Sequence, residues 1–107
     1  MTDTALPNEP ARHQVLELTV NNHPGVMSHI CGLFARRAYN VEGILCMPIA
    51  DDGRYSRIWL RVDEDERLEQ LTRQLNKLID VIEVRRHAAG HALFVRLEAF
   101  FAGGAMV

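Results

Sequence analysis

Apolar residues in this chain repeat with two periods, and the two periods alternate along the sequence. Segments in which every second residue is apolar are typical of half-buried strands, whereas apolar spacings of three and four are typical of one helix face. The segments follow one another as strand, helix, strand, strand, helix, strand. This order is that of a split β-α-β unit, so the sequence predicts an α+β, ferredoxin-like fold with both helices on one face of a four-stranded antiparallel sheet.

The expected domain fills most of the chain. We expect residues 1–13 to be a disordered, polar lead and residues 14–87 to form the domain. Residues 88–107 are expected to contain a linker, one more apolar segment and a tail. Strands are expected over residues 14–21, 41–49, 54–62 and 80–86, the last with Ile82 and Val84 on its inner face. The expected apolar helix faces are Met27, Ile30, Cys31, Phe34 and Ala38 for the first helix, and Leu68, Leu71, Leu75 and Leu78 for the second.

The second predicted strand is apolar on both faces. One face is expected to carry Val41, Leu45, Met47 and Ile49, and the other Ile44 and Cys46. A sheet with helices on one side only should have a polar outer face. The additional apolar face therefore predicts contact with another chain.

The last apolar segment, residues 91–101, fits two structures. Its alternating Leu93, Val95 and Leu97 suit a strand, whereas Leu93, Leu97 and Phe100 would suit a helix face. We expect a strand.

Charge and composition exclude several classes of function. A formal net charge of −2 argues against a dedicated nucleic-acid binder, although Arg57, Trp59 and Arg61 share one face of the third strand. No apolar run approaches the roughly 20 residues that cross a bilayer, and the N-terminus has no apolar signal segment, so a cytoplasmic location is expected. Cys31 and Cys46 are too few for a disulfide framework or a zinc site and are expected to be buried, reduced thiols.

No catalytic pattern stands out. The histidines lack the spacing of metal-binding motifs, and the sequence has no nucleophile elbow, phosphate loop or Rossmann glycine pattern. The loop before the first helix has no Cys-x-x-Cys, which argues against a metallochaperone. We therefore expect a protein that binds rather than catalyses, without a metal or cofactor of its own.

The turn between the first strand and the first helix is the candidate binding site. The free N–H groups of Gly25, Val26 and Met27 are expected at the positive end of the helix dipole, which suits a carboxylate. Gly25 lets a ligand approach the backbone closely. Asn22 either caps the helix or binds a polar group of the ligand.

The same residues resemble a known family. The stretch LELTVNNHPGVMSHICGLFARRAYNVEGILCMP (residues 16–48) and the later RLEQLTRQLNKLIDVIEV segment are similar to the ACT-type regulatory domain of acetohydroxyacid (acetolactate) synthase small subunits. The likeness covers residues 14–87 and is nearest to the short, valine-sensitive form.

The resemblance implies a noncatalytic subunit that dimerises through the second strand. It implies activation of a large catalytic subunit, which carries thiamine diphosphate, Mg²⁺ and FAD, and feedback inhibition by L-valine at the dimer interface. Carried onto this chain, the effector-binding residues are Asn22, Gly25, Val26 and Met27 from one protomer and Asn40 and Val41 from its partner. Longer relatives add a second domain, and residues 91–101 resemble its first strand. The alternatives are that this segment packs on the dimer or docks on the large subunit.

Two alternatives stay open. In the first, the chain is a stand-alone amino-acid sensor that acts on another enzyme or regulator. In the second, it is a structural activator without an effector. The sequence does not choose among valine, leucine and isoleucine, because one methylene in an apolar pocket discriminates by only about 1–3 kcal/mol.

Overall fold

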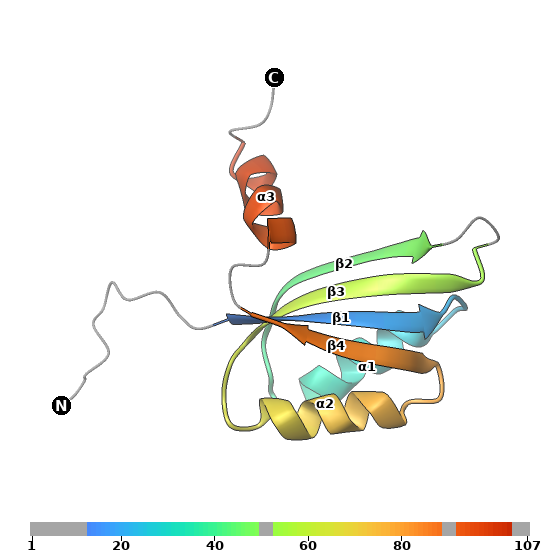
Figure 1. Ribbon diagram of the computed structural model, residues 1–107. Coiled ribbons are helices and arrows are strands. Elements are labelled where there is room, and N and C mark those ends of the chain that lie inside the picture. The colour runs from blue at the N-terminus through green and yellow to red at the C-terminus, as the bar shows by residue number, and fades with distance from the viewer. Residues whose placement is uncertain (1–12, 50–52, 89–91, 104–107) are drawn as a thin grey trace.

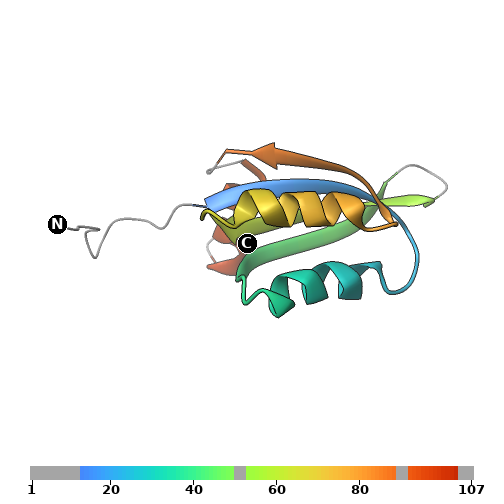
Figure 2. The same cartoon turned by 90° about the horizontal axis from the view of Figure 1, so that it is seen from below.

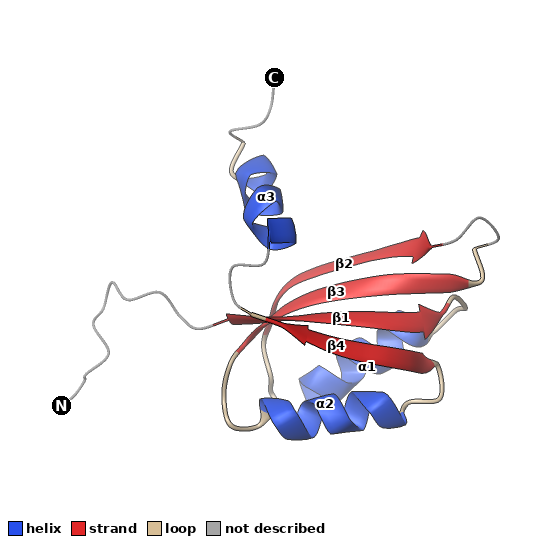
Figure 3. Cartoon of the chain, in the orientation of Figure 1, coloured by secondary structure: helices blue, strands red, loops and turns tan. Residues whose placement is uncertain are grey.

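A computed structural model describes residues 13–49, 53–88 and 92–103 of the chain. The elements in chain order are β1 (His13–Asn21), α1 (Val26–Arg36), β2 (Val41–Ile49), β3 (Tyr55–Asp63), α2 (Leu68–Lys77), β4 (Val81–His87) and α3 (Ala92–Phe101). The strands form one antiparallel sheet in the order β2-β3-β1-β4, with α1 and α2 on the same face (Figure 1 and Figure 3). The predicted ferredoxin-like fold is confirmed. Residues 1–12 of the predicted lead lie outside the described residues, and His13, expected in that lead, is the first residue of β1.

The core lies between the helices and the two central strands. Figure 2 shows both helices on one side of the sheet. The inward apolar residues predicted for the first and third strands are all buried, and β1 also buries Val15 and Glu17 on its outer face. The buried set is Leu16, Leu18 and Val20 of β1, Ile58, Leu60 and Val62 of β3, and Leu68, Leu71 and Leu75 of α2.

The buried face of α1 differs from the prediction. The helix buries Val26, Ile30, Leu33 and Phe34, whereas Cys31 is exposed. Ile30 and Phe34 belong to both faces, Met27 is partly buried, and Val26 and Leu33 take the place predicted for Cys31. Ala38 lies beyond the last helical residue, has a φ of +52° and is exposed.

Two irregularities in the sheet reverse the expected faces of Val41 in β2 and Ile82 in β4, whereas Val84 of β4 packs on the core as predicted. Between Val41 and Gly43 the register of β2 on β3 shifts, so Val41 pairs with Val62 and packs on the core, opposite to its expected face. A second shift in the β1–β4 ladder puts Val81 on the inner side and leaves Ile82 exposed. In both strands the extra residue of a bulge reverses which side chains face inward.

The segment predicted as a fifth strand is the helix α3. Phe94 is buried against Gly43 of β2, where a Cβ atom would lie 2.9 Å from the Phe94 ring. Glu98, one turn further along, pairs with Arg61 of β3 at 3.0 Å. Phe94, Leu97 and Glu98 are spaced three and four residues apart, so a helix places them on one face. A strand would place Leu97 on the opposite face from the other two. No helix of the described segments is long and apolar enough to cross a membrane.

Truncation of a core leucine should test this packing. Leu71 is fully buried, so Leu71→Ala should lower the free energy of unfolding by about 2–5 kcal/mol, through lost burial and the cavity left behind. Ile79 is 91% exposed, and Ile79→Ala is the matched control, with a change within about 0.5 kcal/mol. Urea unfolding followed by circular dichroism measures both; equal losses in the two variants would contradict the assigned core.

Candidate functional site

The turn between β1 and α1 is shaped by a glycine in a left-handed conformation. Gly25 has a φ of +91°, a value that residues with a side chain rarely adopt, and nothing lies within 4 Å of its Cβ position. Its carbonyl accepts the His29 N–H at 3.0 Å, which closes the first turn of α1. That first turn contains no acidic residue. No carboxylate of the first turn therefore competes with a bound anion for the positive end of the helix dipole.

A pocket of about 240 Å³ lies beside this turn. It contains four of the predicted binding residues, Asn22, Gly25, Val26 and Met27. The rest of its wall comes from β1, the turn and the inner face of β2 and β3, namely Val20, Asn21, His23, Pro24, Cys46, Ser56 and Ile58. The pocket thus combines a helix N-terminus at one side with apolar side chains at the other, the combination that a small apolar amino acid requires.

Asn22 does not cap the helix. No side chain caps α1; the Asn22 Nδ2 instead donates to the Gly53 carbonyl at 2.7 Å, and the Asn22 backbone N–H donates to the Arg54 carbonyl at 3.0 Å. The capping interpretation is therefore wrong. Asn22 fixes the turn to the chain that enters β3.

The backbone N–H groups of the turn are not equivalent. The Val26 N–H, expected to face a ligand, points at the His23 carbonyl over 3.4 Å, a long hydrogen bond. Among the described residues, the Gly25 N–H has no backbone partner. Met27 is a first-turn residue, whose N–H has no partner within the helix. Gly25 and Met27 are thus the better donors for a carboxylate.

His23 and Asp80 form a contact that the sequence analysis did not find. The His23 Nε2 lies 2.7 Å from Asp80 Oδ1, and His23 Nδ1 lies 3.0 Å from the Pro24 carbonyl. The hydrogen bond to Pro24 and then that to Asp80 raise the pKa of His23 above its ordinary value of 6.5. Asp80 is itself buried and also accepts from Asn21 Nδ2 at 3.3 Å. A protonated His23 therefore forms an ion pair with the Asp80 carboxylate beside the start of α1.

Cys46 lines the pocket from β2. Its partner across the β2–β3 ladder is Ile58, so its side chain shares the inner face of the sheet. Cys46 and Cys31 are both exposed, which makes the prediction of buried thiols wrong. Partial burial raises the pKa of the Cys46 thiol, against a smaller opposing effect of a hydrogen bond with Ser56. Cys46 is therefore a packing residue of the pocket and not an activated nucleophile.

Asn40 and Val41 lie away from this pocket. Asn21 and Ile49 both pair with Tyr55, so the last residues of β1 and β2 lie at the same end of the strands as the turn. Val41 is the first residue of β2 and lies at the opposite end of that strand, roughly 25 Å away at about 3.3 Å per residue. Within one chain, the six predicted binding residues are not brought together.

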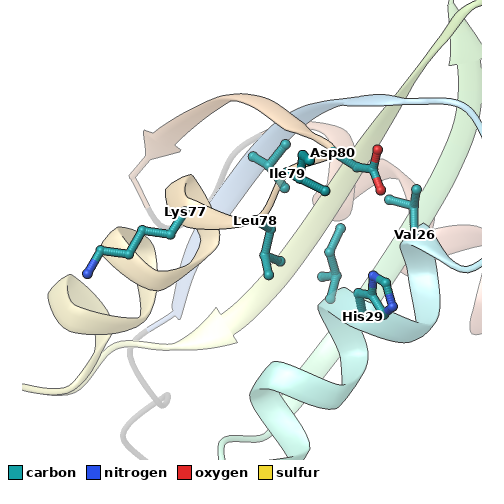
Figure 4. A pocket seen from close by; sticks show the side chains of 8 residues that line it. Val26, His29, Lys77, Leu78, Ile79 and Asp80 are labelled. Carbon is teal, nitrogen blue, oxygen red and sulfur yellow. The ribbon is translucent and has the colours of Figure 1, made fainter.

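A second pocket, of about 260 Å³, lies on the other side of α1 (Figure 4). It is mostly apolar, and in Figure 4 Lys77 extends away from the other lining side chains. The carboxylate of Asp80, also in its wall, is already bonded to His23 and Asn21. Of the predicted binding residues this pocket contains only Val26, whereas the first pocket contains four, so the first pocket is the better candidate for an amino-acid site.

Comparison with known proteins gives a consistent result. The sequence model described as the AHAS small subunit-like ACT domain matches residues 16–83. The acetolactate synthase isozyme 1 small subunit of Escherichia coli K12 is 58% identical over 87 residues, which cover 81% of this chain and 90% of that protein. The isozyme 3 small subunit of the same organism is 34% identical over 92 residues and is covered to 56%. A solved acetolactate synthase small subunit from Thermotoga maritima shares the fold, with a TM-score of 0.62, 24% identity, and coverage of 85% of this chain and 68% of that one.

The His23–Asp80 contact predicts a pH dependence. Because the pKa of His23 is raised in the folded chain, its contribution to stability is complete below pH 6.5 and disappears as the pH rises through the folded-state pKa. The wild-type chain should therefore exceed His23→Gln in free energy of unfolding by more at pH 5.5 than at pH 8.5. Urea titrations at both pH values measure this difference. In an Asp80→Asn background the pH dependence should shrink; a difference that is independent of pH would contradict the assignment.

Proposed function

The chain belongs to the family of AHAS small subunit-like ACT domains, and we propose that it regulates an acetolactate synthase by binding L-valine. As a small subunit of this type it is not catalytic on its own. The observation that carries the proposal is the pocket at the β1–α1 turn, where a helix N-terminus without a first-turn carboxylate meets an apolar wall.

In the proposed complex the two ends of valine use different parts of the pocket. The carboxylate accepts hydrogen bonds from the N–H groups of Gly25 and Met27, helped by the dipole of α1. The isopropyl group contacts the apolar side chains of Val26 and Cys46. Asn22, held by its bond to Gly53, is placed to contact the amino group through its side-chain oxygen.

The free edge of β2 supports a dimer. β2 and β4 are the two edges of the sheet. β4 exposes Ile82 but also carries the charged Glu83, Arg85 and Arg86, the usual protection of an exposed edge. β2 exposes Ile44 and Met47, and Glu42 is its one charged residue. A two-fold axis perpendicular to the sheet would pair β2 with the β2 of a second copy in antiparallel orientation.

This pairing would complete the site. Antiparallel β2 strands bring the start of one strand to the end of the other. The partner's Asn40 and the partner's Val41 would then lie at the same end of the strands as the Asn22–Met27 turn. Residues that are roughly 25 Å apart in one chain are thereby expected to contribute to one effector site in the dimer.

The remaining parts of the proposal concern the partner enzyme. The chain is expected to bind the large catalytic subunit in the cytoplasm, and that subunit to hold the thiamine diphosphate, Mg²⁺ and FAD. Names of relatives as acetolactate synthase small subunits support this assignment. Binding of valine then lowers the activity that the small subunit confers.

Calorimetric titration tests the effector site directly. L-valine should release heat on binding to the wild-type chain. Asn22→Ala should weaken binding about three- to tenfold, the effect of one lost hydrogen bond. Asn76→Ala is the matched control, since Asn76 is an exposed amide bonded within α2, and it should bind valine as the wild type does.

Two substitutions of Gly25 separate strain from charge. Both meet the unfavourable φ of +91°, and only Gly25→Asp also puts a carboxylate against that of valine. Gly25→Asp should therefore bind valine at least tenfold more weakly than Gly25→Ala. If the wild-type chain gives no heat at millimolar valine, or if all variants bind equally, the effector site lies elsewhere.

Reconstitution tests the regulatory role. Adding the chain to a purified acetolactate synthase large subunit should raise acetolactate formation, and L-valine should reverse the increase. Gly25→Asp should still activate the enzyme but respond weakly to valine. Activation without any valine response would favour the structural activator. Failure to bind the large subunit, with valine binding intact, would favour the stand-alone sensor.

A further inference from the structure

A hollow of about 90 Å³ lies between α3 and the free edge of β2. Phe94, Leu97 and Phe101 of α3 line it from above, and Gly43 and Ile44 of β2 form its floor. Gly43 contributes no side chain, and Phe94 packs directly against it. The hollow therefore opens at the edge where a second copy of β2 would pair.

We propose that this hollow receives Met47 of a second copy, so that α3 holds the partner's β2 in place. The proposal rests on the β2 dimer of the proposed function and extends it. It assigns to α3 a role in the interface that the ferredoxin-like domain alone does not have.

The register of the strands places Met47 at the hollow. β2 has nine residues, and full antiparallel overlap of two copies sets each strand's midpoint, Leu45, opposite its counterpart. Gly43 then lies opposite the partner's Met47. Gly43 pairs with Arg61 and Met47 with Arg57, so both lie on the outer face of the sheet, where α3 sits. The partner's Met47 would emerge beside α3.

The chemistry of the two surfaces is complementary. Met47 is 58% exposed and Phe101 is 88% exposed in the single chain, and both are apolar. The unbranched side chain of methionine fills irregular hollows and makes favourable contacts between sulfur and aromatic rings. Burial of the two against each other removes both from water.

The stability of α3 points the same way. The helix has ten residues and buries Phe94 alone against its own domain. Isolated helices of this length are marginal in water, and most of the stability of a short helix comes from its packed face. A second packed face, on the partner, would fix α3 on the sheet.

The test measures dimer affinity by sedimentation equilibrium of the full chain. Phe101→Ser should raise the dimer dissociation constant at least about tenfold, because burial of a large apolar side chain is worth more than that factor. Phe100→Ser is the matched control: Phe100 is 59% exposed but does not line the hollow, and its substitution should change the constant by less than about twofold. Circular dichroism verifies that both variants keep the fold.

A double-mutant cycle identifies the contact. Met47→Ala and Phe101→Ser should each weaken the dimer, and the double variant should weaken it by clearly less than the product of the two factors. Independent effects that multiply, or an unchanged dimer in Phe101→Ser, would overturn the role of α3 and leave the β2 dimer standing.

Ile44→Asp distinguishes failure of the dimer itself. Ile44 lies on the edge strand, and an aspartate from each copy would put like charges into the interface, so this variant should be monomeric. A wild-type chain that is monomeric at high micromolar concentration, or an Ile44→Asp chain that dimerises like the wild type, would overturn the β2 interface and this inference with it.

Discussion

The two helices α1 and α2 cover only part of the four-stranded sheet, and the rest of the structure follows from the strand that they leave exposed. The inner side chains of β1 and β3 are fully buried, whereas Ile44 and Cys46 on the inner face of β2 stay exposed. The outer face of β2 adds Met47. An edge strand with apolar groups on both faces gains free energy only when another surface covers it. This exposed apolar edge is the feature on which the proposed dimer rests.

The same strand order explains why one chain brings together only some of the proposed binding residues. Because β1 and β2 run in the same direction on either side of β3, the turn after β1 lies at the end of β2 and not at its start. The turn supplies backbone donors, which α1 orients and Gly25 leaves accessible. Groups from the start of β2 can reach this turn only from another chain. In the proposed dimer, a site divided in this way would respond both to the ligand and to the state of the interface.

The inward-facing residues could be predicted from the sequence wherever the apolar spacing of a strand or helix is unbroken. The alternation in β1 and β3 and the leucine spacing of α2 are continuous, so their inward faces were predicted correctly. Each of the two bulges adds one residue and so interrupts the alternation of the strand. The faces inferred for Val41 and Ile82, which assumed an unbroken alternation, are therefore reversed. Gly43, beside the first bulge, was a local signal that a strand interior is irregular.

Other features depend on contacts between distant segments. His23 and Asp80 are separated by 57 positions and meet because β1 and β4 are neighbours, which no local pattern encodes. The segment of α3 fits both periods. Its choice of helix follows the position of Phe94 over Gly43 and the pairing of Glu98 with Arg61, which only the folded sheet supplies.

The two surfaces of β2 offer a physical connection between effector and assembly. Cys46 lines the pocket at the β1–α1 turn, and Met47, the next residue, faces the opposite side of the sheet, where the proposed dimer places the partner's α3. A ligand shifts a protein between two arrangements only if it binds one of them more tightly. A valine that contacts Cys46 would favour one position of β2, and the same backbone movement would alter the contact of Met47 with α3. Regulation then requires no separate path through the core, because consecutive residues of one strand belong to both surfaces.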